Sequence, residues 1–374
     1  MLTLVKLHKW KSALLLSIII LLLVLPYLVK TVAQQSILDY TKPYGIKQVS
    51  IDSVGFNLFK GSISLHNLNL YTDKVSSESQ PEKGIIHIGE LSANLEWLGL
   101  LQKRIWIQSL YFAETNLPFT LNENNQLLLA NIPLTQKTLT EEPEPSETTE
   151  MVILPGLDNV QFHNIHLSLA YKNETSSFTI QDLNLEHLYA WSEDYGRLQF
   201  KAYFNKSLIQ SNLQLHLFAD EPKIIGTLKT AQLNVSELKQ FIPKTGIDFN
   251  AILDTDITFT LAQTDNGITL FQQGNISLSQ VDFTQQNTQA TLKQLDWKGD
   301  LFYNESNSKK IDFNGKLSVQ ELAAQHNHQK LEVAQTSLAG KTQLSLATET
   351  HINTQQTINI SGIKLSDHIT QQTL

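Results

Sequence analysis

Two pairs of side chains in this sequence have the types and spacing that metal binding or acid–base catalysis would need. His163 and His166 stand close together in the segment HNIH, and imidazole nitrogens are common metal ligands. Both fall at polar positions of an expected strand, with no cysteine or carboxylate cluster near them. Asp254 and Asp256, in the segment DTD, would share one strand face, but acid–base work also needs a pocket that shifts a pKa. We therefore predict no metal site, no catalytic residue and no cofactor.

The motifs of the common enzyme classes are also absent from the sequence. It contains no nucleophile elbow, phosphate-binding loop, dinucleotide fingerprint or H-E-x-x-H segment. The absence of cysteine excludes disulfides and thiolate chemistry. A net charge of −8 argues against a nucleic-acid partner, because phosphate binding needs clustered lysine and arginine. These features favour a protein that is not an enzyme.

The N-terminus has the features of a membrane anchor. Ser12–Val29 is a run of 18 uncharged, mostly apolar residues, near the lower limit for a helix that spans a bilayer. Three lysines precede this run and Lys30 alone follows it, which predicts a cytoplasmic N-terminus and a translocated remainder of the chain. A cleaved signal peptide is the alternative, with Thr31–Ala33 as the cleavage site, although the apolar core exceeds the usual length of about 7–15 residues.

One pattern of apolar residues recurs through the rest of the chain. In ISLHNLNL, from Ile63 to Leu70, apolar residues hold the first, third, sixth and eighth positions, with the polar pair His66-Asn67 in the middle. A strand of strict period two would point the two halves at opposite faces. The other copies begin at Ile86, Ile105, Val160, Phe178, Ile276, Ala290, Leu317 and Ile358, with degenerate copies at Leu228 and Leu331. The last five copies are spaced alternately by 14 and 27 residues, which is typical of a repeat architecture.

Two local structures would explain the polar pair in the middle of this motif. In a β-bulge, one extra residue restores the parity, keeps all four apolar side chains on one face and bends the strand. A two-residue hairpin turn is the alternative, but it favours Asn-Gly or Asp-Gly, and no middle pair has that sequence. The remaining positions are mostly polar, so each unit should have one apolar and one solvated face. We predict a mostly β fold: an N-terminal transmembrane helix followed by an elongated, curled antiparallel sheet, groove-like and repetitive, with few short helices.

Composition divides the chain into five expected segments. They are a basic cytoplasmic N-terminus (1–11), the anchor (12–29), a first β region (35–134), an acidic flexible linker rich in Pro and Thr (135–150), and a β-repeat region (151–374) whose pattern is open to continuation beyond residue 374. Trp97–Leu101 is expected to form one helical turn. Ser236 is expected to cap a short helix that ends before Pro243.

The order of these segments resembles the AsmA-like family of Gram-negative inner-membrane-anchored periplasmic proteins, the superfamily that includes TamB and YhdP. The resemblance rests on the anchor, on GSISLHNLNLYTD and IHIGELSANLEWLGLLQKRIWIQSLYFAETNLPF, and on LNVSELKQFIPKTGIDFNAILDTDITFTL followed by GNISLSQVDF and LKQLDWKGDLF. It covers most of residues 1–365 and includes no catalytic motif. It implies a single-pass inner-membrane protein, mostly periplasmic, with a chorein-type β-groove whose apolar interior conducts phospholipid toward the outer membrane.

Under that interpretation the first three motif copies line a lipid groove. The lining residues would be Ile63, Leu65, Leu68, Leu70, Ile86, Ile88, Leu91, Ile105, Ile107 and Leu110. The predicted function is phospholipid transport or envelope lipid homeostasis, with phospholipid, the inner membrane and envelope proteins as partners. Two alternatives stay open: the apolar face is the closed core of an ordinary β-sandwich, or the chain is an assembly or scaffold protein that docks other proteins on its sheet.

Overall fold

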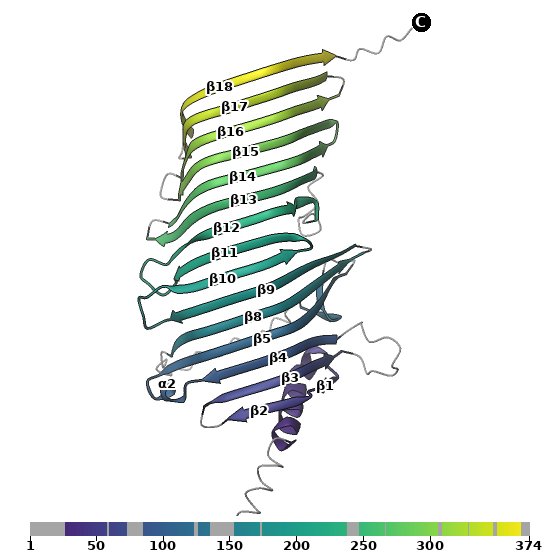
Figure 1. The fold of residues 1–374 in the computed structure, drawn as a ribbon, viewed down its shortest axis with the longest axis vertical. Coiled ribbons are helices and arrows are strands. Elements are labelled where there is room, and N and C mark those ends of the chain that lie inside the picture. The colour runs from purple at the N-terminus through teal and green to yellow at the C-terminus, as the bar shows by residue number, and fades with distance from the viewer. Residues whose placement is uncertain are drawn as a thin grey trace, which may run out of the picture. The chain divides into compact units, whose positions relative to one another are not determined.

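Most of the chain is folded into β-strands. The computed structural model describes residues 27–57, 60–72, 85–122, 126–134, 153–172, 174–237, 247–265, 267–305, 309–327, 329–346 and 350–367. The strands belong to one mixed sheet of 18 strands, with few helices, which confirms the prediction of a mostly β fold (Figure 1). The chain divides into two compact units, Met1–Ser177 and Phe178–Leu374, with the division inside a strand.

In the described part of the first unit, a helix over residues 27–41 is followed by eight strands. After the short 3-10 helix η1 (Lys42–Tyr44) come β1 (Gln48–Ser50), β2 (Ser53–Asn57), β3 (Ser62–Tyr71), β4 (Ile85–Leu95), α2 (Trp97–Leu101), β5 (Arg104–Leu121), β6 (Leu127–Leu129), β7 (Ile132–Pro133) and β8 (Leu154–Tyr171). Helix α2 confirms the turn expected at these residues. Glu96 caps it, because its side chain accepts a hydrogen bond from the backbone N–H of Leu98 at 3.1 Å.

The pairing in the first unit departs from the expected antiparallel sheet at one place. Strand β3 pairs antiparallel with β1, β2 and β4, and β4 pairs antiparallel with β5. Strand β8 instead lies parallel to β5, from Arg104 beside Leu154 to Leu121 beside Tyr171. The purely antiparallel prediction is therefore wrong here. The connection from Leu121 to Leu154, which includes β6 and β7, is long enough for the crossover that a parallel pair needs.

The second unit is an antiparallel meander in which each strand pairs with the next along the chain. Its strands are β9 (Glu174–Tyr189), β10 (Gly196–Phe204), β11 (Ser207–His216), β12 (Lys223–Asn234), β13 (Ile247–Thr264), β14 (Gly267–Gln285), β15 (Thr288–Asn304), β16 (Lys309–His326), β17 (Gln329–Leu346) and β18 (Thr350–Asp367). Two-residue turns join several of them. Asn205 and Gln286 take φ angles of 52° and 51° in such turns, as tight hairpins require.

One cluster of buried hydrophobic residues lies in the first unit, and single buried apolar side chains such as Val281 and Val333 occur in the second. Seven buried residues form the cluster of the first unit: Ile51, Val54, Leu65, Leu68, Ile86, Ile88 and Ala130. Val29, Ala33 and Ile37 pack against this cluster from the helix of residues 27–41. Their spacing of four residues puts them on one side of that helix, so the helix covers the apolar side of β3 and β4.

Four of the expected segments lie largely or wholly outside the described residues. They are the expected basic N-terminus 1–11, residues 12–26 of the expected anchor, the expected linker 135–150, and residues 238–246, which include most of the helix expected after Ser236. Within the part of the chain that the structure does describe, no helix combines the length and the apolar character needed to cross a bilayer.

Candidate functional site

Each strongly conforming motif copy lies within a single continuous strand. The copies that start at Ile63, Ile86, Ile105 and Val160 lie in β3, β4, β5 and β8, and those that start at Ile276 and Ile358 lie in β14 and β18. The hairpin alternative is therefore wrong, because the chain does not reverse at the polar pair. The polar pair instead changes the direction of the side chains within one strand.

The β-bulge prediction is confirmed at four strand pairs. Between β4 and β5, Asn94 pairs with Ser109 and Leu95 with Ile107, so Gln108 is an extra residue in the middle of the motif. Gln181 is the extra residue in the same way between β9 and β10. The β12/β13 and β13/β14 pairs also shift register at their motif copies. At these places one strand carries two residues opposite one, as in a bulge.

At other strand pairs that carry the motif, both strands bend at the same place and neither has an extra residue. On β14, β16 and β18 the second residue of the polar pair has a positive φ angle: 52° at Gln280, 50° at Glu321 and 66° at Gly362. The residues that face them, Lys293 and Ala334, have no positive φ, and the register continues unshifted across them. The bulge prediction is therefore wrong for these pairs. Because neighbouring strands have equal numbers of residues here, the pairing between them continues while all the strands bend at the same position.

Both the β-bulge and the in-register kink place the two halves of the motif on the same face. In the first unit Leu65 pairs with Leu91, and Leu68 pairs with Ile88, across the kink between β3 and β4. Leu65 and Leu68 are both buried although they are three positions apart in the sequence, which strict alternation would not allow. The parity change is thus the reason that one face collects four apolar residues from each copy.

The expected groove-lining residues of the first unit have unequal surroundings. Leu65, Leu68, Ile86 and Ile88 belong to the buried cluster beneath the helix of residues 27–41, and Leu70 and Leu91 pack at its margin. Ile107 and Leu110 are half-buried on β5, whereas Ile63 and Ile105 are exposed. Four of the ten residues are therefore covered by protein in this structure. Contact of the set with lipid stays a prediction.

The second unit presents the same motif as apolar rows that cross several strands. One row follows the pairing Ile276–Trp297–Leu317–Leu338–Ile358 from β14 to β18. The neighbouring row follows Leu278–Leu295–Val319–Thr336–Ile360. Adjacent members of a row are about 4.8 Å apart along the sheet. These rows make a continuous apolar surface on one face of β14–β18.

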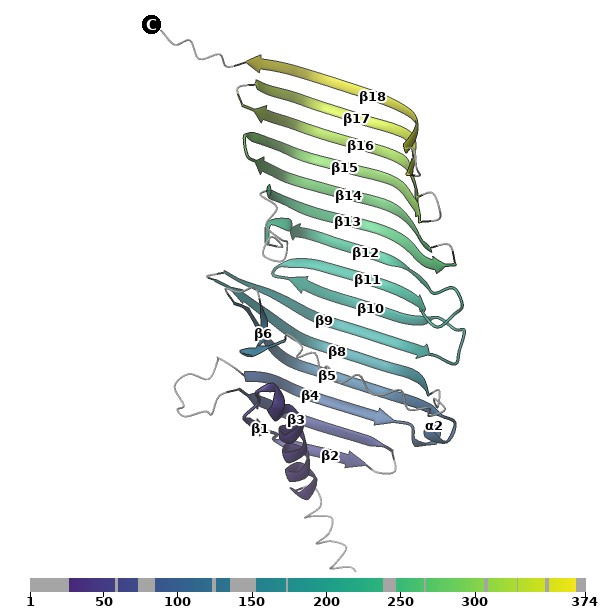
Figure 2. The same ribbon diagram turned by 180° about the vertical axis from the view of Figure 1, so that it is seen from behind.

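Among the described residues, no element forms a second layer over this apolar face. Figures 1 and 2 show β13–β18 as a single curved layer without a helix or another sheet over it. Leu278, Leu295, Leu317 and Leu338 are half-buried by their neighbours in the sheet rather than enclosed. On β18 the apolar side chains are open to solvent, up to 79% exposed at Leu365. The face is therefore an apolar surface of unusual extent for a protein in water.

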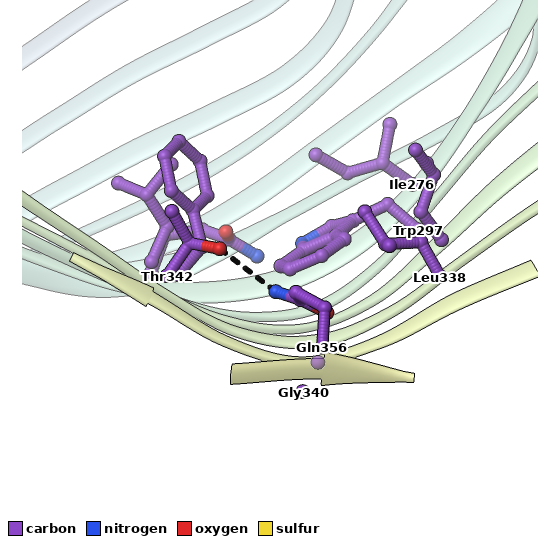
Figure 3. A pocket seen from close by; sticks show the side chains of 11 residues that line it. Ile276, Trp297, Leu338, Gly340, Thr342 and Gln356 are labelled. Atoms are coloured by element: carbon purple, nitrogen blue, oxygen red, sulfur yellow. Dashed lines mark hydrogen bonds between the residues drawn. The ribbon is translucent and has the colours of Figure 1, made fainter. Parts of the chain in front are cut away.

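A cavity of about 380 Å³ indents this face of the second unit (Figure 3). Its lining includes Gln272, Ile276, Trp297, Phe313, Leu338 and Gln356, from strands β14 to β18. Trp297 and Phe313 meet edge to face, with ring centroids 6.2 Å apart. The lining contains no charged residue. The volume and the apolar walls fall in the range of small-molecule sites, about 300–1,000 Å³.

A row of glycines forms the floor beside Trp297 and was not among the residues predicted from the sequence. Gly274, Gly299, Gly315 and Gly340 pair in register across β14–β17. A Cβ at Gly315 would lie 2.5 Å from the carbonyl oxygen of Lys298 and 2.9 Å from Cη2 of Trp297. Only glycine lets the indole ring lie this close to the backbone. The sequence did contain a signal for it, because a glycine inside an expected strand indicates that a side chain or another backbone comes close to that strand.

The opposite face of the second unit is charged and solvated. Lys293 and Glu321 form an ion pair with 2.6 Å between Nζ and Oε1, and Lys330 and Glu332 form another at 2.6 Å. The hydrogen bond and the charge of Lys330 hold the pKa of Glu332 below its ordinary value. Because both pairs are solvent-exposed, they contribute little to stability. Their role is to make this face polar, in contrast to the uncharged apolar face.

The histidine and aspartate pairs with candidate chemistry lie on strands β8 and β13. His163 and His166 are half-buried on β8, and among the described residues no group of three or more His, Cys, Asp or Glu is placed to hold a metal. Asp254 Oδ1 accepts a hydrogen bond from the backbone N–H of Gln232 at 2.8 Å, which satisfies a donor at the bulge of β12. Asp256 forms an exposed ion pair with Lys229 at 3.8 Å. Both carboxylates therefore contact the neighbouring strand β12.

Comparison of the chain with protein-family models, with curated proteins and with solved structures found no match in any of the three. Membership of the AsmA-like family stays a prediction from the sequence.

Proposed function

We propose that this protein is a membrane-anchored lipid carrier that shelters phospholipid acyl chains on the apolar face of β13–β18. In this proposal Ser12–Val29 anchors it in the inner membrane, the strands lie in the periplasm, and the protein serves phospholipid transport or envelope lipid homeostasis without making or breaking a bond. One observation carries the proposal: the motif rows of β14–β18 make an uncharged apolar face that no described element covers.

The energetics of such a face favour an acyl chain as its occupant. Leucine and isoleucine side chains on this surface are partly hydrated, and covering them with hydrocarbon removes both surfaces from water. Each buried CH₂ group contributes about 0.8 kcal/mol, so a single acyl chain gains substantially from the contact. A phosphate head group gains nothing there, because the rows offer no charge to pair with it. The head group would therefore stay in water.

The geometry of the rows also suits passage along the sheet. A chain that lies across the strands meets an equivalent apolar side chain at each strand, about 4.8 Å further on. Successive positions are chemically similar, so movement from one to the next needs no reaction. This arrangement supports transfer in preference to storage at one point.

The test is the amount of phospholipid that stays with the purified protein. Leu317→Asp places a charge on the open apolar face, while Lys316→Asp changes the adjacent exposed residue on the opposite face. We expect Leu317→Asp to lower the phospholipid retained per protein several-fold and Lys316→Asp to leave it unchanged. Lipid held at the N-terminal apolar segment is common to both variants and cancels. Equal retention by the two variants would contradict the proposal.

A specific observation favours a second function, protein docking in envelope assembly. Strand β18 is the last strand of the array in Figure 1, and Ile352, Ile358, Ile360, Ile363 and Leu365 on it are all more than half exposed. An exposed strand of this kind suits addition of a strand from another protein. Replacement of Ile360 by Lys would then abolish association with that protein, whereas Leu295→Asp, on β15 in the same apolar row, would leave that association intact. Loss of lipid with no loss of protein association would exclude this alternative.

A further inference from the structure

The cavity beside Trp297 contains polar groups that lack a partner although they are buried. Gln272, on β14, is only 7% exposed, and its Nε2 has no hydrogen-bond partner. Gln356, on β18, donates from Nε2 to Oγ1 of Thr342 at 2.8 Å, and its buried Oε1 is left without a partner. A buried amide without its hydrogen bonds is destabilising, so such groups are usually completed by a ligand or water. The two glutamines lie on the first and last strands that line the cavity.

The surroundings of these amides restrict what would complete them. Ile276, Leu338 and the ring of Trp297 stand on the same side of the sheet as Gln356 and Thr342 in Figure 3, and no charged residue lines the cavity. An ionised ligand would be buried there without a counter-charge, which is strongly unfavourable. A neutral group with an acceptor for Gln272 Nε2, attached to a long apolar tail, fits both the amide and the walls.

We propose that this cavity is a binding site for the acyl-ester region of a glycerolipid. The ligand is a neutral diacylglycerol, which carries the free glycerol hydroxyl that a diacyl phospholipid lacks. Its ester carbonyl accepts a hydrogen bond from Gln272 Nε2, the adjoining acyl chain lies along Ile276, Trp297 and Leu338, and the hydroxyl donates to Gln356 Oε1. The inference rests on the proposed function, since it makes this cavity the place on the apolar face where the lipid's linkage is recognised. The glycine floor lets the indole of Trp297 lie against the backbone, which leaves room for the acyl chain above the ring.

The probes that test this site differ only in the ester carbonyl. We would titrate the full chain in detergent with a diacylglycerol brominated in the middle of its chains, and with the equally brominated dialkyl ether. Bromine quenches nearby tryptophan, and the part of the quenching that disappears in Trp297→Phe reports on the cavity. We expect the wild-type protein to bind the ester about five- to tenfold more tightly than the ether, the value of one hydrogen bond to a buried amide.

Two variants then separate the roles of the two amides. Gln272→Leu should abolish the preference for the ester and leave ether affinity intact, whereas Gln356→Leu should weaken both ligands equally, since both carry the hydroxyl. Gln272→Leu should also raise the unfolding temperature of the lipid-free protein, because it removes a buried donor without a partner. Gln273→Leu, the same change at the exposed neighbouring residue, is the control and should leave the preference unchanged.

The possible outcomes test the ester site and the proposed lipid-sheltering function separately. If ester and ether quench Trp297 with equal affinity in the wild-type protein, the ester site is wrong and the lipid-sheltering face stands. If Gln272→Leu keeps the ester preference, the assignment of Gln272 is wrong. If no brominated lipid quenches Trp297, both the site and the sheltering face are contradicted.

Discussion

The same motif forms a closed core in the first unit and an open apolar face in the second. At the sixth motif position the first unit has Leu68, which is 4% exposed within a closed cluster. In the second unit the same position is held by Val281, which is 7% exposed, by the half-buried Leu295 and by Ile363, which is 59% exposed. Leu68 and Leu295 both follow a kink that points them to the apolar side of their strand. The motif therefore determines which side of a strand is apolar. It does not determine whether that side becomes a core or a surface.

The difference arises from what lies over the sheet. In the first unit Val29, Ala33 and Ile37 of the 27–41 helix, together with Ala130 in the turn between β6 and β7, cover the apolar side. Over β13–β18 the part of the chain that is described supplies no such cover (Figure 2). An apolar sheet face without a cover leaves its side chains available to an apolar ligand.

The largest expected effect comes from placing a charge at the equivalent position of each unit. Leu68→Asp should lower the free energy of unfolding by about 5 kcal/mol or more, because an unpaired carboxylate would be buried in a closed core. Leu295→Asp should cost only about 1–2 kcal/mol, because water reaches this face. Denaturant unfolding of the two variants, followed by circular dichroism, measures the difference. Equal losses would mean that the second unit is also closed.

A smaller effect is expected from filling the glycine floor of the open face. Gly315→Ala should lower the free energy of unfolding by about 2 kcal/mol, because its Cβ would meet the Lys298 carbonyl and the Trp297 ring. Lys316→Ala, one residue along on the solvated face, should change it by less than about 0.5 kcal/mol. The same unfolding experiment compares them. A tolerated alanine at residue 315, with unchanged Trp297 fluorescence, would show that the indole does not lie against the floor.

The smallest expected effect concerns the kinks. Gln280 has a φ of 52°, which costs a non-glycine residue about 1–2 kcal/mol, so Gln280→Gly should raise the free energy of unfolding by about 0.5 kcal/mol after the entropy of glycine is deducted. Ala334, in the same kink row but without a positive φ, is the control, and Ala334→Gly should lower stability by about 0.5–1 kcal/mol. Effects of the same sign at both positions would argue against the left-handed kink.

Much of the strand structure could be predicted from the local pattern. The alternation of apolar and polar residues predicts the strands, and the skipped position predicts a parity change at residues such as Asn67 and Gln280. The helical turn at Trp97–Leu101 was also predicted, and the structure shows that Glu96 caps it. These features depend on residues close together in the chain, which a sequence shows directly.

The remainder depends on which strands become neighbours. The parallel pairing of β5 with β8 is set by a crossover rather than by the strand residues, and an in-register kink differs from a bulge only in the count on the partner strand. The cavity joins Gln272 to Gln356 across five strands, so no local pattern signals it. For the same reason the expected lining of the first unit did not anticipate the helix that covers Leu65 and Leu68.

The central claim is that lipid contacts the open face of the second unit and not the core of the first. The most direct test is a photo-crosslinking side chain introduced in cells at Leu317 on the open face, at Leu68 in the closed core and at Lys316 on the solvated face. We expect phospholipid adducts from position 317 and none from positions 68 and 316. Lipid adducts from 68 or 316 as abundant as those from 317, or protein adducts alone from 317, would contradict the account.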